Sequence, residues 1–228
     1  MTTRDQFIGT VSRALGRSEL PAAPGQSSYR HTVHTDTLKD SGQDELARVF
    51  IDTSKAVGAD ICETTRDALK DSILQAVAQC RPGPILAANE PLLKDLGPAL
   101  ALAAGRTVRL WDAGNSCKDN VRFAEKAAVG IAIARLALAE SATVLFFNHE
   151  GCGRSVTLLP ESNIYIIPKS VIRPRLTQGM AFVRECKGHL PSSVNFVSGP
   201  SATSDIELVR VVGVHGPVHV VHIVVHDM

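Results

Sequence analysis

Hydrophobic residues recur along the first half of the chain with the spacing of amphipathic helices. The first twenty residues carry apolar side chains at helical intervals, and charged residues interrupt any continuous apolar stretch. Residues 44–57, 65–80, 91–103 and 117–127 show the same periodicity, and Pro98 marks a kink or a break in the third of these segments. The pattern predicts an N-terminal amphipathic helix followed by a series of further helices.

Short apolar runs alternate with these helices and predict the strands of a sheet. The last run, VHVVHIVV, is β-branched and almost unbroken, which is typical of a strand buried on both faces. Strands that alternate with helices indicate βαβ units. The expected fold is therefore α/β: a largely parallel sheet flanked by helices, with an N-terminal helical appendage. The predicted strands are residues 85–88, 107–111, 129–133, 142–147, 164–167, 194–198 and 218–225.

The segment LPAAPGQSSY, residues 20–29, separates the first helix from the rest of the chain. Its Pro, Gly and Ser content is typical of an exposed linker. We therefore expect an N-terminal helix and linker over residues 1–30 and one α/β domain over residues 31–228.

Composition narrows the classes of function. The chain has 24 Lys and Arg against 23 Asp and Glu, so its net charge of +1 gives no long-range attraction to nucleic acid or anionic membranes. The longest weakly charged stretch, residues 127–148, is interrupted by Arg135 and Glu140, which argues against a membrane span. We expect a cytoplasmic protein.

The cysteines and histidines form no complete metal-binding motif. The five cysteines are odd in number and include no CxxC pair, which argues against a disulfide framework, a zinc ribbon or an iron–sulfur cluster in this chain. Cys152 lies between two glycines, where a small residue in a tight turn is favoured over a reactive thiol. The C-terminal histidines lack further ligands, so we expect no metal and no cofactor in this chain.

The segment SGPSATSDIELV, residues 198–209, is the first candidate site. Its glycine turn is expected to follow a strand and to lead into a helix from about Ser204, with acidic residues in the first turn of that helix. Free backbone N–H groups at such a helix start bind anions, and nearby hydroxyls add donors, although an ordinary capped helix is the alternative. The binding residues predicted here are Gly199, Pro200, Ser201, Thr203 and Asp205.

A second candidate is the segment HEGCGRSVTLLP, residues 149–160. Gly151 and Gly153 flank Cys152, and Arg154 supplies a planar guanidinium suited to a carboxylate or phosphate. Open α/β sheets bind ligands beyond the carboxyl ends of their strands. Because this loop follows the predicted strand 142–147, we expect Arg154 at that ligand-binding edge.

Two titratable residues complete the candidates. Glu140 directly precedes an apolar strand, where a carboxylate is costly unless it is paired or used as a base. Pairing is the favoured interpretation, with general-base catalysis as the alternative. His215 lies in the turn GVHGP and is suited to binding an anion or moving a proton.

Together these segments resemble the lactate utilization protein C family, whose defining unit is the LUD domain. The resemblance spans about residues 125–228, and the family usually has Gly at the position of Ala142. The motifs that carry it are AESAT at 139–143, GCGR at 151–154, LLP at 158–160, SGPSATSDIE at 198–207 and GVHGP at 213–217.

The resemblance implies a sheet similar to that of the ribose-5-phosphate isomerase and CoA-transferase superfamily. It also implies a role in oxidising L-lactate to pyruvate, with a cysteine-rich partner and a partner that carries the iron–sulfur clusters. Three interpretations stay open. The chain could bind a small carboxylate through Arg154, the N–H groups after Gly199 and the hydroxyls of Ser201 and Thr203, with His215 or Glu140 taking a proton, as a subunit of an iron–sulfur L-lactate dehydrogenase complex. It could dock the iron–sulfur partner without catalysis. It could also transfer acyl groups or CoA, with Glu140 as nucleophile.

Overall fold

The computed structural model describes residues 3–17, 30–186, 188, 190–205 and 207–228, so the linker expected at 20–29 lies outside the described residues. The chain divides into two compact units, Met1–Val33 and His34–Met228. The first unit contains α1 (Arg4–Ala14), which begins with a capping box: the Gln6 N–H donates to the Thr3 side chain, and the Thr3 N–H donates to the Gln6 side chain.

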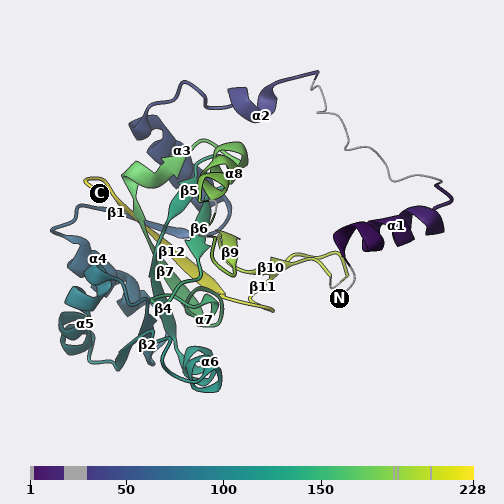
Figure 1. Ribbon diagram of the computed structural model, residues 1–228. Helices are drawn as coiled ribbons and strands as arrows, with labels where there is room; N and C mark the ends of the chain where they lie inside the picture. Colours follow the sequence, from purple (N-terminus) through teal and green to yellow (C-terminus); the bar gives the residue numbers. More distant parts are fainter. Residues whose placement is uncertain (1–2, 18–29, 187, 189, 206) are drawn as a thin grey trace. The chain divides into compact units, whose positions relative to one another are not determined.

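A six-stranded parallel sheet forms the centre of the second unit (Figure 1). Its strand order is β1-β12-β7-β4-β2-β3. The two longest strands, β7 and β12, lie side by side and are buried on both faces, as their apolar runs predict. The predicted α/β class with a largely parallel sheet is confirmed. The bounds are β1 (Asp60–Thr64), β2 (Ile85–Ala87), β3 (Val108–Leu110), β4 (Val129–Ile133), β7 (Ser162–Pro168) and β12 (His219–Val225).

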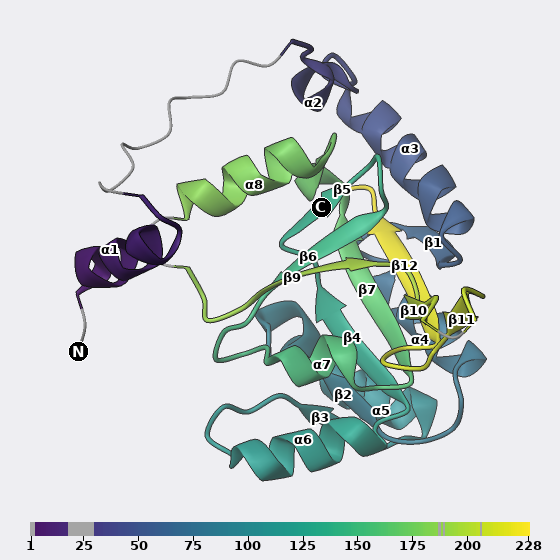
Figure 2. The same cartoon turned by 90° about the vertical axis from the view of Figure 1, so that its right-hand side faces the viewer.

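Helices cover both faces of this sheet (Figure 2). On one face lie α4 (Leu69–Gln79) and α5 (Pro91–Ala104), and α5 continues through Pro98 as a single helix. On the other face lie α6 (Cys117–Lys126) and the short α7 (Arg154–Leu158). Among the described residues, no helix is long and apolar enough to cross a membrane.

The helix α3 (Gln43–Ala56) packs beside β1 and sends Phe50 into the core. The Phe50 ring lies 5.3 Å from the His222 ring, which in turn lies 6.0 Å from the Tyr165 ring. The remaining helical segments are α2 (Val33–Asp36), the 3₁₀ turn Lys169–Val171 and α8 (Leu176–Glu185).

A second sheet packs against the same core and has the order β8-β5-β6-β9. In it, β6 is antiparallel to both of its neighbours, so the predicted strands 142–147 and 194–198 exist but do not belong to the parallel sheet. Successive side chains of β5 and β6 point to opposite faces of this sheet. Leu136, Leu138 and Leu145 contact residues of α8, whereas the residues between them on each strand face the main core. The bounds are β5 (Leu136–Leu138), β6 (Thr143–Phe147), β8 (Ile172–Arg173) and β9 (Val194–Ser198).

The segment after β9 differs from the prediction. Instead of a helix from Ser204, β10 (Ala202–Thr203) and β11 (Val211–Val212) form an antiparallel ribbon. Glu207 and Leu208 have left-handed φ values of 52° and 59°, which a right-handed helix excludes. The Asp205 N–H donates to Thr203 Oγ1, so the local bond that was expected to cap a helix closes a turn instead.

Candidate functional site

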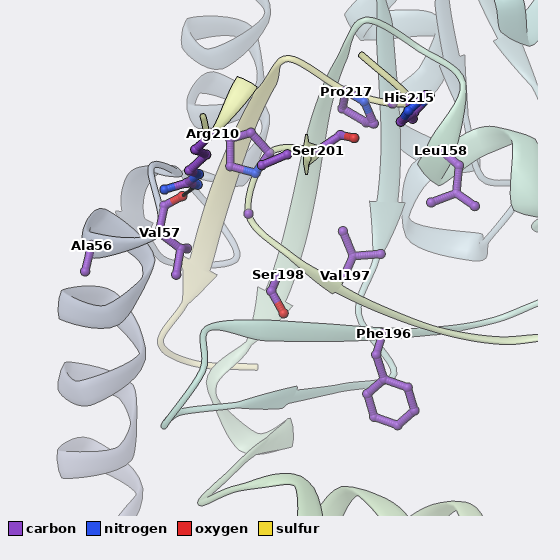
Figure 3. Close-up of a pocket in the computed structure, with 14 residues that line it drawn as sticks. Ala56, Val57, Leu158, Phe196, Val197, Ser198, Ser201, Arg210, His215 and Pro217 are labelled. Carbon is purple, nitrogen blue, oxygen red and sulfur yellow. Dashed lines mark hydrogen bonds between the residues drawn. The ribbon is translucent and has the colours of Figure 1, made fainter. Parts of the chain in front are cut away.

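A cavity of about 520 Å³ opens beside the signature segment, which we define as residues 195–217 (Figure 3). Its wall combines the end of α3, the end of α7, strand β9 with the turn that follows it, and the loop before β12. Of the predicted site residues, this cavity brings together Gly199, Pro200, Ser201 and His215.

The cavity lies at the amino ends of strands of the main sheet. Val57, Leu158 and Pro217 line it, and each of them shortly precedes the start of β1, β7 or β12. The sequence predicted a site at the carboxyl ends. The Gly199–Pro200 turn does follow the carboxyl end of β9, but β9 belongs to the second sheet, and this places the turn at the opposite edge of the main sheet.

Close packing of two turns shapes the wall. The Ser201 N–H donates to the Pro217 carbonyl at 2.9 Å, which ties the two signature motifs together. Gly199 has a φ of 63°, and a Cβ at this position would lie 2.9 Å from Val57 Cγ2. Both the backbone conformation and the lack of space therefore require glycine. A Cβ at Gly216 would lie 3.1 Å from Ser201 Cβ.

The polar groups of the cavity favour an anion. Figure 3 shows Arg210 beside Val57 on one side of the cavity and His215 on the side of Leu158. Arg210 Nη2 donates to the Val57 carbonyl at 3.4 Å, and its guanidinium makes no other hydrogen bond to the described residues. No Asp or Glu is among the described residues that line this cavity. A lining that holds an arginine and no carboxylate attracts negative charge.

A chain of hydroxyls orients one lining residue. Ser198 Oγ lies 2.6 Å from Thr143 Oγ1, which lies 2.7 Å from Ser141 Oγ. These contacts join the Ala-Glu-Ser-Ala-Thr run to the cavity wall. Ala142 occupies the turn within that run with a φ of 48°, the left-handed conformation that glycine adopts most readily.

The other predicted binding loop lies at the opposite edge of the main sheet. The Asn89 N–H, just after β2, donates to the Gly151 carbonyl at 2.7 Å. A Cβ at Gly153 would overlap the ring of Trp111, the residue after β3. Arg154 is exposed at the start of α7 and does not line the cavity. The structure therefore does not bring Arg154 together with the Gly199 turn, as a single carboxylate site would require.

Glu140, Thr203 and Asp205 also lie outside the cavity lining. Glu140 Oε2 forms an ion pair with Arg175 Nε at 2.9 Å, which offsets the cost of placing a carboxylate before an apolar strand. Thr203 Oγ1 donates to Asp205 Oδ2 at 2.8 Å within the exposed ribbon.

Cys152 is a small buried residue in a turn. Its backbone pairs with that of His149, and the residue is 4% exposed. Burial raises the pKa of the Cys152 thiol to about 12, so it is a poor nucleophile.

The C-terminal histidines contact carboxylates or the core. His219 and His226 bond Asp60 and Glu63 on β1, at 2.8 Å and 2.9 Å, and His222 is buried. Within the described part of the chain, no group of three or more His, Cys, Asp and Glu side chains could hold a metal ion.

Sequence reasoning missed Arg210 and Ser198 as lining residues. Arg210 lies outside regular structure on the return of the ribbon, where no periodic pattern marks it. The one available signal was proximity in sequence: Ser198 is the first residue of the SGPSATSDIE motif, and Arg210 lies between that motif and GVHGP.

These features define an α/β domain with a cationic cavity formed by two linked turns. The LUD domain family matches residues 47–225. The lactate utilization protein C of Geobacillus sp. (strain WCH70) is 38% identical to the chain, covering 98% of it and 96% of the relative. That of Bacillus subtilis (strain 168) is 33% identical, with the same coverage. The chain therefore belongs to the LUD domain family, together with these lactate utilization protein C relatives.

A solved structure supports the fold. The crystal structure of a DUF162 family protein from Deinococcus radiodurans matches with a TM-score of 0.60 and 21% sequence identity. The match covers 81% of this chain and 99% of that one. At this identity the likeness concerns the fold alone.

Proposed function

We propose that this chain acts in lactate utilization by binding a small carboxylate in the cavity at the amino edge of the main sheet. The observation that carries the proposal is the lining itself, in which Arg210 and His215 accompany the hydroxyls of Ser198 and Ser201 without any carboxylate. The family and the names of its relatives support the pathway.

The roles of the lining residues follow from their chemistry. Arg210 binds the carboxylate through its free guanidinium donors, and His215 contacts the 2-oxygen of a hydroxy or keto acid. Val57, Leu158 and Phe196 also line the cavity and offer apolar contacts to the alkyl group. A cavity of about 520 Å³ is larger than a three-carbon acid needs, so longer 2-hydroxy and 2-keto acids belong in the same assay.

Titration calorimetry with lactate and pyruvate tests this proposal. Because a charge-assisted hydrogen bond contributes about 1.5–3 kcal/mol, Arg210→Ala should weaken binding about 10- to 100-fold. Arg154→Ala is the matched control, since Arg154 is an exposed arginine outside the cavity, and it should bind as the unaltered chain does. The neutral amide of lactate should give no heat. Absence of heat with every acid at millimolar concentration would contradict the proposal.

A second candidate function is docking of the iron–sulfur partner, and the ribbon supports it. Leu208 is 92% exposed and Val209 is 60% exposed, and both lie at the turn of the β10–β11 ribbon. Val212 and Val214 are also exposed. Clustered exposed apolar side chains are typical of protein–protein contacts. The iron–sulfur clusters that accept electrons from lactate would then belong to this partner, which would act together with the cysteine-rich component.

Co-purification with the two expected partner proteins tests this docking. Leu208→Asp should abolish the complex, because it places a charge in an apolar interface. Leu102→Asp is the control, since Leu102 on α5 is 87% exposed and lies outside the ribbon. Retention of the complex by Leu208→Asp, or its equal loss in both variants, would rule out the ribbon as the specific contact.

A further inference from the structure

Two adjoining hollows lie at the carboxyl ends of β2 and β3, on the opposite edge of the main sheet from the cationic cavity. Their volumes are about 590 Å³ and 480 Å³, and they share Ala113 and Glu150 in their walls. The remaining wall comes from residue 89, from the loop that joins β3 to α6, from α6 itself and from residues 148–151, 155 and 192. This is the edge at which open α/β sheets bind their ligands.

Hydrogen bonds hold this wall in place without a ligand. The His149 N–H donates to the Cys152 carbonyl at 3.0 Å, and the Gly151 N–H donates to His149 Nδ1 at 3.1 Å. His149 Nδ1 is therefore held within the wall, and Nε2 on the far side of the ring lies 3.7 Å from Glu90 Oε1. A wall fixed in this way loses little freedom when a ligand binds.

Neutral polar groups and one aromatic ring line the hollow of about 480 Å³. A Cβ at Gly153 would overlap the Trp111 ring, so the backbone at Gly153 packs against this ring, and Trp111 also lines the hollow. An indole surface suits stacking on a planar ring. Amide side chains both donate and accept hydrogen bonds, as the edge of a nucleobase does. The neutral lining residues include Trp111, Asn115, Asn120, Asn148, Ser155 and Ser192.

Carboxylates line the adjoining hollow. Asp112 and Glu150 belong to its wall, and no Lys or Arg is among the described residues that line either hollow. Arg154 follows Gly153 in sequence but lines neither of them. Carboxylates accept hydrogen bonds from ribose hydroxyls and repel phosphate groups. The charge of the residues that line these hollows is thus opposite to that of the cationic cavity.

We propose that these two hollows form a binding site for a nucleoside, distinct from the carboxylate cavity. Trp111 stacks on the base, the asparagines bond its edge, and Asp112 and Glu150 accept hydrogen bonds from the ribose hydroxyls. A nucleoside is favoured over a nucleotide because a phosphate would lie close to two carboxylates with no lining cation to balance them.

Calorimetry with adenosine, AMP and ribose tests the site. Adenosine should bind at millimolar concentration or below, AMP should bind at least about tenfold more weakly because of charge repulsion, and ribose should bind more weakly because it cannot stack. Glu150→Lys, at an exposed position, should reverse the preference so that AMP binds more tightly than adenosine. Trp111→Leu should remove the adenosine signal, with circular dichroism and the pyruvate titration reporting that the fold is intact.

Three results would overturn this site. The first is the absence of heat with adenosine. The second is binding of AMP or ribose as tight as that of adenosine, and the third is unchanged adenosine binding in Glu150→Lys. The outcome is separable from that of the carboxylate proposal, because Arg210→Ala should leave adenosine binding unchanged.

Discussion

Lowering the pH from 6.5 to 4.5 should reduce the free energy of unfolding by about 2 kcal/mol through His222 alone. His222 is completely buried between the rings of Phe50 and Tyr165. Its Nδ1 lies 2.9 Å from Ser54 Oγ, and its Nε2 has no partner among the described residues. Burial removes the ring from water, which disfavours its charged form and lowers the pKa of His222 from 6.5 to about 3.

The sign of the effect follows from proton binding. Between pH 6.5 and about 3 the unfolded chain binds a proton at this histidine and the native chain does not. Stability from this residue is therefore fully present above pH 6.5 and is lost as the pH falls, by about 1.4 kcal/mol per unit.

Urea unfolding at stepped pH measures the slope. His222→Asn removes the titrating ring while keeping an amide near Ser54, so the variant should lose this part of the pH dependence. His31→Asn, at an exposed histidine, should keep the slope of the unaltered chain. Equal slopes in the unaltered chain and in His222→Asn would show that His222 is not buried as a neutral ring.

Gly130→Ala should destabilise the fold by about 3 kcal/mol or more, at the upper end of overpacking effects. Gly130 lies within β4, and a Cβ there would overlap Asn163 Oδ1 and the Val156 carbonyl and lie 2.9 Å from Pro160 Cγ. The Val156 carbonyl oxygen is a backbone atom and Pro160 Cγ is a ring atom, so neither can rotate away from the added methyl group. The methyl group must therefore displace α7 or the strand itself.

Denaturant unfolding of purified variants measures this cost. Gly42→Ala is the matched control, because Gly42 has a φ of −69° and a Cβ there would meet nothing within 4 Å. That change should cost no more than about 1 kcal/mol, the usual effect of alanine at a helix N-cap. Similar losses in both variants would mean that α7 does not pack against β4 as closely as described.

The elements that the sequence predicted well are those whose burial is uniform. β12 and β7 are apolar throughout, and the helices of the main domain carry a clear apolar stripe. β1, with the sequence DICET, was missed because it lies at the edge of the sheet and is mostly polar. The assignment of β6 and β9 to a second sheet depends on pairing between distant segments, which periodicity does not encode.

The site shows the same division between local and long-range information. Gly199, Ser201 and His215 were recognised from local motifs, and the structure places them around one cavity. Arg154 was assigned to the same site because of its chemistry, yet it lies at the opposite edge of the main sheet. Arg210 lines the cavity instead, because the ribbon folds back on itself where a helix was expected.

The most direct test of the carboxylate cavity is amide chemical-shift mapping of the full chain during a titration with pyruvate. The account predicts shifts concentrated at Gly199, Ser201 and Gly216, which line the cavity, and their loss in Arg210→Ala. Shifts concentrated at Gly151 and Gly153 would place the ligand at the opposite edge, and no saturable shifts at all would exclude carboxylate binding; either result would contradict the account.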